Sequence, residues 1–155
     1  MHLVALAPVH PPRPQILPVE MERLGIIVDV SHLSDAGFYD VLKYSKKPFV
    51  ASHSNSRKIT NVVRNLTDDM IRKLADKGGL TGINFCSDFI KTTSHTGNTF
   101  TYVDDIVKHI KYIRNVGGLD VIALGTDFDG IPSTLEIKDA SQIQILADGL
   151  LKKWF

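Results

Sequence analysis

Two Ser-His pairs, Ser31-His32 and Ser52-His53, each follow a short apolar run, and the two histidines lie 21 residues apart. In parallel βα architectures, ligands and metals bind at the carboxyl ends of the strands. A separation of one βα repeat predicts that both imidazoles lie at the same edge of adjacent strands. A single histidine there is more often a hydrogen-bonded structural residue, but the repetition favours a borderline metal such as zinc. Because catalytic zinc takes three protein ligands, a further ligand must come from elsewhere.

A carboxylate, that of Asp127, and a guanidinium, that of Arg64, are further candidates for the same site. Asp127 opens an Asp-Phe-Asp-Gly sequence directly after another apolar run. A carboxylate at that edge can hold a metal, orient a water or carry a proton, and a turn without chemistry is the alternative. The spacing does not fit a calcium-binding EF-hand loop. Arg64 lies eleven residues after His53 and suits bidentate capture of a carboxylate, with a solvated or helix-capping charge as the alternative.

Apolar runs alternate with amphipathic segments, which predicts an α/β fold with about four parallel strands. The expected strands are residues 26–30, 49–52, 80–85 and 121–125. The expected helices are residues 18–24, about ten residues from Ser34, a segment from Thr67 to Gly78-Gly79, residues 102–116 and residues 141–152. Thr67 is the expected N-cap of its helix, which explains Asn65-Leu66-Thr67 better than a glycosylation site does.

Other histidines and the single cysteine are not expected to take part in this chemistry. His109 lies beside the apolar stripe of its helix and is expected to pack there. Residues 86–101 are predicted to form a long loop of the kind that makes lids or binding sites, with His95 solvated inside it. Cys86 is expected to be a small buried residue. His2 and His10 are assigned to a Pro-rich tail, residues 1–17, which precedes the folded part at residues 18–155.

Composition excludes several classes of function. Net charge is +1 and there is no basic block, so nucleic acid is not an expected partner. No apolar run approaches the roughly 18 residues of a membrane span. One cysteine excludes an internal disulfide and fits a reducing compartment. With no recognisable signal peptide, these features predict a cytoplasmic protein.

Three segments carry a specific resemblance: RLGIIVDVSH, PFVASHSNSR and ALGTDFDGI. In order, spacing and flanking residues they resemble the membrane (renal) dipeptidase family, zinc peptidases of the amidohydrolase superfamily. The similarity runs from about Val19 to the C-terminus. The resemblance implies a TIM-type (β/α)8 barrel, of which this chain would supply the C-terminal half, strands five to eight.

The resemblance also implies roles for individual residues. His32 and His53 match the histidines that bind one of the family's two zinc ions, and Arg64 matches the arginine that recognises the substrate's terminal carboxylate. Asp127 matches the active-site aspartate, a proton carrier and substrate contact. The implied reaction is hydrolysis of a dipeptide amide bond by a water that the metals activate.

Other family features are missing from the sequence. It contains no His-x-Asp tripeptide, which ligates the other zinc in the family. We therefore expect negligible activity from this chain alone and, at most, one weak zinc site. An inactive fragment or pseudoenzyme, and a non-catalytic subunit that completes a barrel with another chain, remain alternatives. Because half a barrel has open strand edges, self-association or pairing with a complementary half is expected.

Overall fold

A computed structural model describes residues 17–91, 100–132 and 134–154 of the chain. Its centre is a parallel sheet in the order β1-β2-β4, formed by Val50–Ala51, Leu80–Ile83 and Ile122–Leu124. These strands lie within three of the four predicted segments. Parallel pairing brings their carboxyl ends to one edge of the sheet, as the sequence predicts.

The fourth predicted strand, residues 26–30, is shorter than expected. Its residues 28–30 run beside β1, where the Val50 amide donates to Val28 O at 3.0 Å and the Val30 amide donates to Val50 O at 2.8 Å. The ladder reduces to one parallel bridge between Asp29 and Val50. Ile26 and Ile27 have no place in this ladder, and Ile27 is 68% exposed, because the described residues provide no second neighbour on that side.

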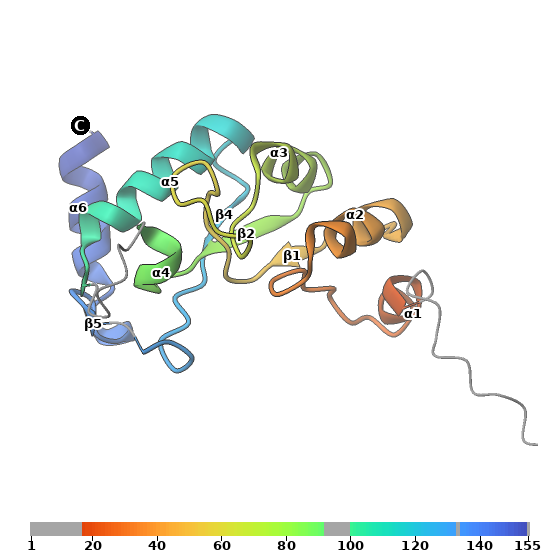
Figure 1. Cartoon of the computed structure of the whole chain (residues 1–155), viewed down its shortest axis with the longest axis horizontal. Coiled ribbons are helices and arrows are strands. Elements are labelled where there is room, and N and C mark those ends of the chain that lie inside the picture. The colour runs from red at the N-terminus through yellow and green to blue at the C-terminus, as the bar shows by residue number, and fades with distance from the viewer. Residues whose placement is uncertain (1–16, 92–99, 133, 155) are drawn as a thin grey trace, which may run out of the picture.

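Helices cover one side of the sheet (Figure 1). Helices α2, α3 and α5 follow one another along that side, and α6 packs against α5. The described helices are α1 (Leu17–Arg23), α2 (Asp35–Tyr44), α3 (Asp68–Asp76), α4 (Ser87–Ile90), α5 (Val103–Gly117) and α6 (Gln144–Trp154), with a short 3-10 turn at Ala140–Gln142. One-sided coverage is what an arc of a βα barrel requires, because helices form its outer layer.

Local signals set where these helices begin and end. Ser34 accepts a hydrogen bond from the Gly37 amide at 3.2 Å and caps α2. Thr67 caps α3 in the same way, through the Met70 amide at 3.2 Å, which confirms its predicted role. Helix α5 ends at Gly118, whose φ of +89° places it in the region that favours glycine.

The predicted loop 86–101 is wrong in part. It contains α4, and it ends in strand β3, Phe100–Thr101, which pairs in parallel with β5, Thr134–Leu135. This pairing joins segments about thirty residues apart, so no local pattern indicates it. His95 and residues 1–16 lie outside the described residues.

Large apolar side chains fill the space between helices and sheet. Phe49, Phe85, Ile83, Leu74 and Ile113 are fully buried there. At the opposite edge, β4 has no further strand partner among the described residues, and Leu124 on it is 51% exposed. Beside it, an apolar groove of about 450 Å³ opens between β4, α5 and α6. None of the described helices is long and apolar enough to cross a membrane.

Candidate functional site

His32 and His53 meet at the carboxyl edge of the sheet, as the sequence predicts. Their Nε2 atoms lie 2.9 Å apart, and their ring centroids are separated by 4.9 Å. The segment around them is tied together by hydroxyl groups. The Ser31 hydroxyl accepts from the His53 amide at 3.0 Å and lies 3.1 Å from the Ser54 hydroxyl. The two histidine-bearing turns are therefore joined directly to each other.

A relay of hydrogen bonds fixes the tautomer of His53. The Ser52 hydroxyl donates to Asp29 Oδ2 at 2.5 Å, because a carboxylate can only accept. Ser52 Oγ also lies 2.7 Å from His53 Nδ1. Since the one hydroxyl proton goes to Asp29, Nδ1 must be the donor in this second contact. The network thus leaves His53 Nε2 with a free lone pair, and it holds the ring in the manner of a metal-ligating histidine.

Arg64 sets the tautomer of His32 by the same reasoning. Its Nη2 lies 3.3 Å from His32 Nε2, and a guanidinium can only donate. Two acceptor nitrogens therefore face each other 2.9 Å apart. Such an arrangement is repulsive unless a proton or a cation lies between them. Tetrahedral zinc ligands with Zn–N bonds of about 2.1 Å stand roughly 3.4 Å apart, so a small separation of the rings would admit the ion. The two histidines fit a borderline divalent cation, which would take the single lone pair of His32 Nε2 in place of the contact with Arg64.

Burial favours the neutral ligand form of His53. Desolvation lowers the pKa of this imidazole, and the positive charge of Arg64 acts in the same direction. Asp127 and Asp29 oppose this effect without cancelling it. Burial raises the pKa of Asp29, but hydrogen bonds from the Ser52 hydroxyl and from the Ser52 and Ser31 amides outweigh that effect and lower it overall. The carboxylate therefore stays charged, and the imidazole stays neutral, near pH 7.

Two glycines allow the strand ends to approach closely. A Cβ atom on Gly82 would lie 2.0 Å from Ser52 O, and one on Gly125 would lie 1.8 Å from the same atom. No real side chain tolerates such contacts. Because Ser52 directly precedes His53, these glycines of β2 and of the turn after β4 let the backbone around His53 approach the ends of β2 and β4.

Asp127 follows β4 at the same edge and has a left-handed backbone with φ of +61°. Its Oδ2 accepts a hydrogen bond from Asn84 Nδ2 at 3.1 Å. The next residue, Phe128, packs edge-to-face on the buried Phe85 ring with centroids 5.6 Å apart. The turn is thus anchored to the segment that follows β2. Burial lowers the pKa values of His53 and Arg64, and the charge of Asp127 opposes this effect at both groups.

Arg64 is half-buried in this site and is incompletely paired. Its guanidinium lies over the Phe89 ring, with Cζ 5.2 Å from the centroid. Its Nε is buried and has no hydrogen-bond partner among the described residues. Burial lowers the pKa of this group, and the carboxylates of Asp127 and Asp29 oppose that effect. A buried donor without a partner is costly.

Sequence reasoning missed three members of this site: Asp29, Ser52 and Asn84. A carboxylate inside the apolar run IIVDV and a serine directly before each histidine were the available signals. Nothing in the local pattern indicates that Asn84 faces Asp127, because 43 residues separate them. Within the described residues, no group of three or more His, Cys, Asp or Glu side chains is placed to hold a metal. The two histidines could supply only part of the ligand set of a metal ion.

Comparisons with known proteins identify the family of this chain. The profile of the membrane dipeptidase family, peptidase family M19, matches residues 15–155. A protein in the pqqA 5' region of Klebsiella pneumoniae, uncharacterized, is 36% identical over 131 residues, which are 84% of this chain and 48% of that protein. An uncharacterized dipeptidase of Schizosaccharomyces pombe is 41% identical over 113 residues, 73% of this chain and 26% of that protein. The chain thus spans about half or less of the curated relatives that it matches.

Solved structures of metallopeptidases superpose on this chain. The dipeptidase AC, a metallopeptidase, superposes with a TM-score of 0.83 at 30% identity over 91% of this chain and 41% of its own. A metallopeptidase from Rhodobacter sphaeroides, liganded with a phosphinate mimic of the dipeptide L-Ala-D-Ala, gives a TM-score of 0.80 at 30% identity, over 91% of this chain and 40% of its own. These matches confirm the α/β fold of a partial TIM-type barrel. The chain belongs to the membrane dipeptidase family, peptidase family M19.

Proposed function

We propose that this chain carries part of a zinc-dependent dipeptidase site, in which His32 and His53 hold one metal ion and Arg64 binds the terminal carboxylate of the substrate. One observation carries the proposal. Two imidazole acceptors face each other at 2.9 Å with a guanidinium 3.3 Å from one of them. A cation between the rings and an anion on the arginine would satisfy both sets of groups. The family match adds the reaction class.

In this proposal, different residues of the chain orient the metal ligand and bind the substrate. A zinc ion bound there would act as a Lewis acid on the scissile carbonyl and would lower the pKa of an attacking water. Asp29, through Ser52, would hold the His53 ring in the tautomer that leaves Nε2 free to bind such an ion. Arg64 aligns the dipeptide by its carboxylate, for which a planar guanidinium is well suited.

Asp127 is the proposed proton carrier. Its Oδ2 is held by Asn84, while the rest of the carboxylate remains available to a substrate group. A carboxylate beside the metal can take a proton from the attacking water and pass it to the leaving amine. The electrostatic effect of Asp127 on the pKa values of His53 and Arg64 supports this proposed role.

We further propose that residues 18–155 supply one half of a barrel and that the remaining ligands come from the other half. The chain covers 41% of one solved dipeptidase and 40% of another. Both edges of its sheet end beside exposed apolar side chains, Ile27 at one edge and Leu124 at the other. Pairing of these edges, with a complementary half or with a second copy, would cover them. A non-catalytic subunit of a completed barrel is the second candidate, which the two-ligand metal set favours.

Zinc stoichiometry measured together with dipeptide turnover tests these proposals. We expect the isolated chain to bind at most one zinc ion weakly and to lose it in both His32→Ala and His53→Ala. Unchanged zinc binding in both variants would show that the histidines are not ligands. Zinc binding with turnover only after addition of a complementary half supports the enzyme, whereas zinc binding without turnover in the completed barrel supports the non-catalytic subunit.

A further inference from the structure

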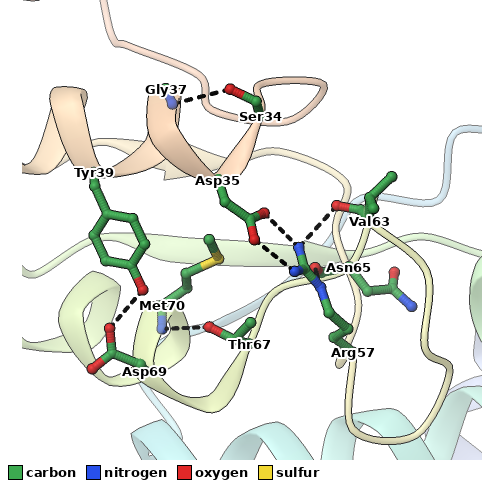
Figure 2. A network of polar contacts seen from close by, with 10 residues as sticks. All are labelled: Ser34, Asp35, Gly37, Tyr39, Arg57, Val63, Asn65, Thr67, Asp69 and Met70. Carbon is green, nitrogen blue, oxygen red and sulfur yellow. Dashed lines mark hydrogen bonds and ion pairs between the residues drawn. The ribbon is translucent and has the colours of Figure 1, made fainter.

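The loop that carries Arg64 is held by another arginine, Arg57. Arg57 Nε donates to Asn65 O at 2.7 Å, and its Nη2 donates to Val63 O at 3.0 Å. These carbonyls belong to the two residues that flank Arg64 in the sequence. Figure 2 shows the contact between the Val63 carbonyl and this guanidinium. One side chain therefore fixes the backbone on both sides of Arg64.

The same guanidinium ties this loop to the segment that follows His32. Arg57 Nη1 donates to Asp35 Oδ2 at 2.8 Å, and Nη2 donates to Asp35 Oδ1 at 2.7 Å. Asp35 is the first residue of α2, three positions after His32. The Arg57 side chain is only 17% exposed, and a two-bond contact between guanidinium and carboxylate is geometrically specific. The contact thus sets the distance between the loop of Arg64 and the turn of His32.

Arg64 depends on such support because little else orders it. Its own guanidinium touches His32 and the Phe89 ring, while its Nε has no partner among the described residues. A long side chain with few contacts loses much conformational entropy when it must adopt one geometry. Fixing the backbone at Val63 and Asn65 limits where the guanidinium can reach.

We propose that Arg57 is a positioning residue for substrate-carboxylate recognition, which holds the carbonyl groups of the two residues that flank Arg64 near α2 and so aims the Arg64 guanidinium at the space beside His32. This inference rests on the proposed role of Arg64. A lysine cannot replace Arg57, because one ammonium group cannot hold a carboxylate by two bonds and two carbonyls at the same time.

The test uses the full chain, ¹⁵N-labelled and loaded with zinc, in nuclear magnetic resonance titrations with alanyl-alanine and with its C-terminal amide. The ratio of the two affinities measures recognition of the carboxylate. We expect Arg57→Lys to lower this ratio about tenfold and Asp35→Asn to lower it about threefold, because the first loses three contacts and the second weakens one charged contact. Arg23→Lys is the matched control, since Arg23 also contacts a carboxylate, that of Glu20, by two bonds at 2.8 and 2.6 Å.

Each outcome is decisive. If the unmodified chain does not prefer the acid to the amide, the proposed role of Arg64 is wrong and this inference is lost with it. If the unmodified chain prefers the acid and both variants keep that preference, Arg57 does not position Arg64, while the proposed function stands. An equal loss of affinity for acid and amide indicates a purely structural role and also overturns the inference. If Arg57→Lys does not fold, Asp35→Asn alone decides.

Discussion

We predict that the stability of the fold falls at acidic pH because of His109. This histidine is fully buried, and both of its ring nitrogens are hydrogen-bonded. Its Nδ1 accepts from the Ser56 amide at 3.2 Å, and its Nε2 donates to Ile90 O at 2.7 Å. A proton added to Nδ1 would face another N–H group. Burial lowers the pKa of His109 from 6.5 to about 4, and the hydrogen bond to Ile90 raises it only in part. The charges of Lys108 and Asp105 act in opposite directions.

The sign and size of the effect follow from linkage. Between pH 6.5 and about 4, the unfolded chain binds a proton at this histidine and the folded chain does not. Stability is therefore fully present above pH 6.5 and is lost as the pH falls through this window. At about 1.4 kcal/mol per pKa unit, the difference between 6.5 and about 4 corresponds to a loss of roughly 3 kcal/mol. That loss is a large fraction of the stability of a typical domain.

Urea unfolding at a fixed protein concentration, from pH 7.5 to pH 4, measures this loss. The informative variant is His109→Gln, because glutamine can accept from Ser56 and donate to Ile90 without titrating. We expect the difference in unfolding free energy between the two proteins to change by about 3 kcal/mol across the window, in favour of the variant at low pH. Asn115→Gln, an exposed and uncharged change on the same helix, should follow the unmodified protein. Parallel pH curves for the unmodified protein and His109→Gln would refute the reasoning.

Three further predictions concern the site and the assembly. The isolated chain should have negligible dipeptidase activity, because two histidines leave the metal without its third ligand; turnover at the rate of a complete family enzyme, free of contaminating peptidase, would contradict this. Ser52→Ala should weaken zinc binding by about 10- to 100-fold, since it breaks the relay that orients His53; calorimetry checks this, and an unchanged affinity would remove Asp29 and Ser52 from the site. In sedimentation equilibrium, a stable chain should be larger than a monomer, and a cooperatively melting monomer at micromolar concentration would rule out the open-edge argument.

Much of the fold could be predicted from the sequence because its signals are local. Ser34 and Thr67 are hydroxyl residues placed directly before amphipathic segments, and both cap helices. Three apolar runs became strands, since a parallel strand that is buried on both faces is apolar throughout. The two Ser-His pairs gave the position of His32 and His53 because alternation of strands and helices brings equivalent residues to one edge.

Other features depend on contacts that no local pattern indicates. The segment 26–30 is apolar, yet it forms only a single bridge, because a strand needs neighbours and the described residues supply one. Strand β3 exists only because β5 reaches it from later in the chain. The side chains of Arg57 and Asn84 are ordinary polar residues in the sequence. They acquire a role only when loops from different βα units meet.

The backbone is strained where the chemistry is proposed. Among the described non-glycine residues, a positive φ occurs at His32, with +72°, and at Asp127, with +61°. Such a conformation costs about 1–3 kcal/mol per residue, and glycine would adopt it freely but would supply neither an imidazole nor a carboxylate. At His32 the neighbouring amides hold the turn, since Ser31 N donates to Asp29 Oδ1 at 3.0 Å and Leu33 N donates to Val30 O at 3.0 Å.

At Asp127, other contacts hold the positive-φ backbone in place. The Gly130 amide donates to Asp127 O at 3.0 Å, and Asn84 holds the side chain. A Cβ on Gly130 would lie 2.3 Å from Asp127 Oδ1, so the glycine of Asp-Phe-Asp-Gly leaves room for the carboxylate rather than adopting an unusual conformation itself. The strained backbone at these two residues is thus held by hydrogen bonds that involve neighbouring residues. That arrangement is expected where side-chain position matters more than local stability.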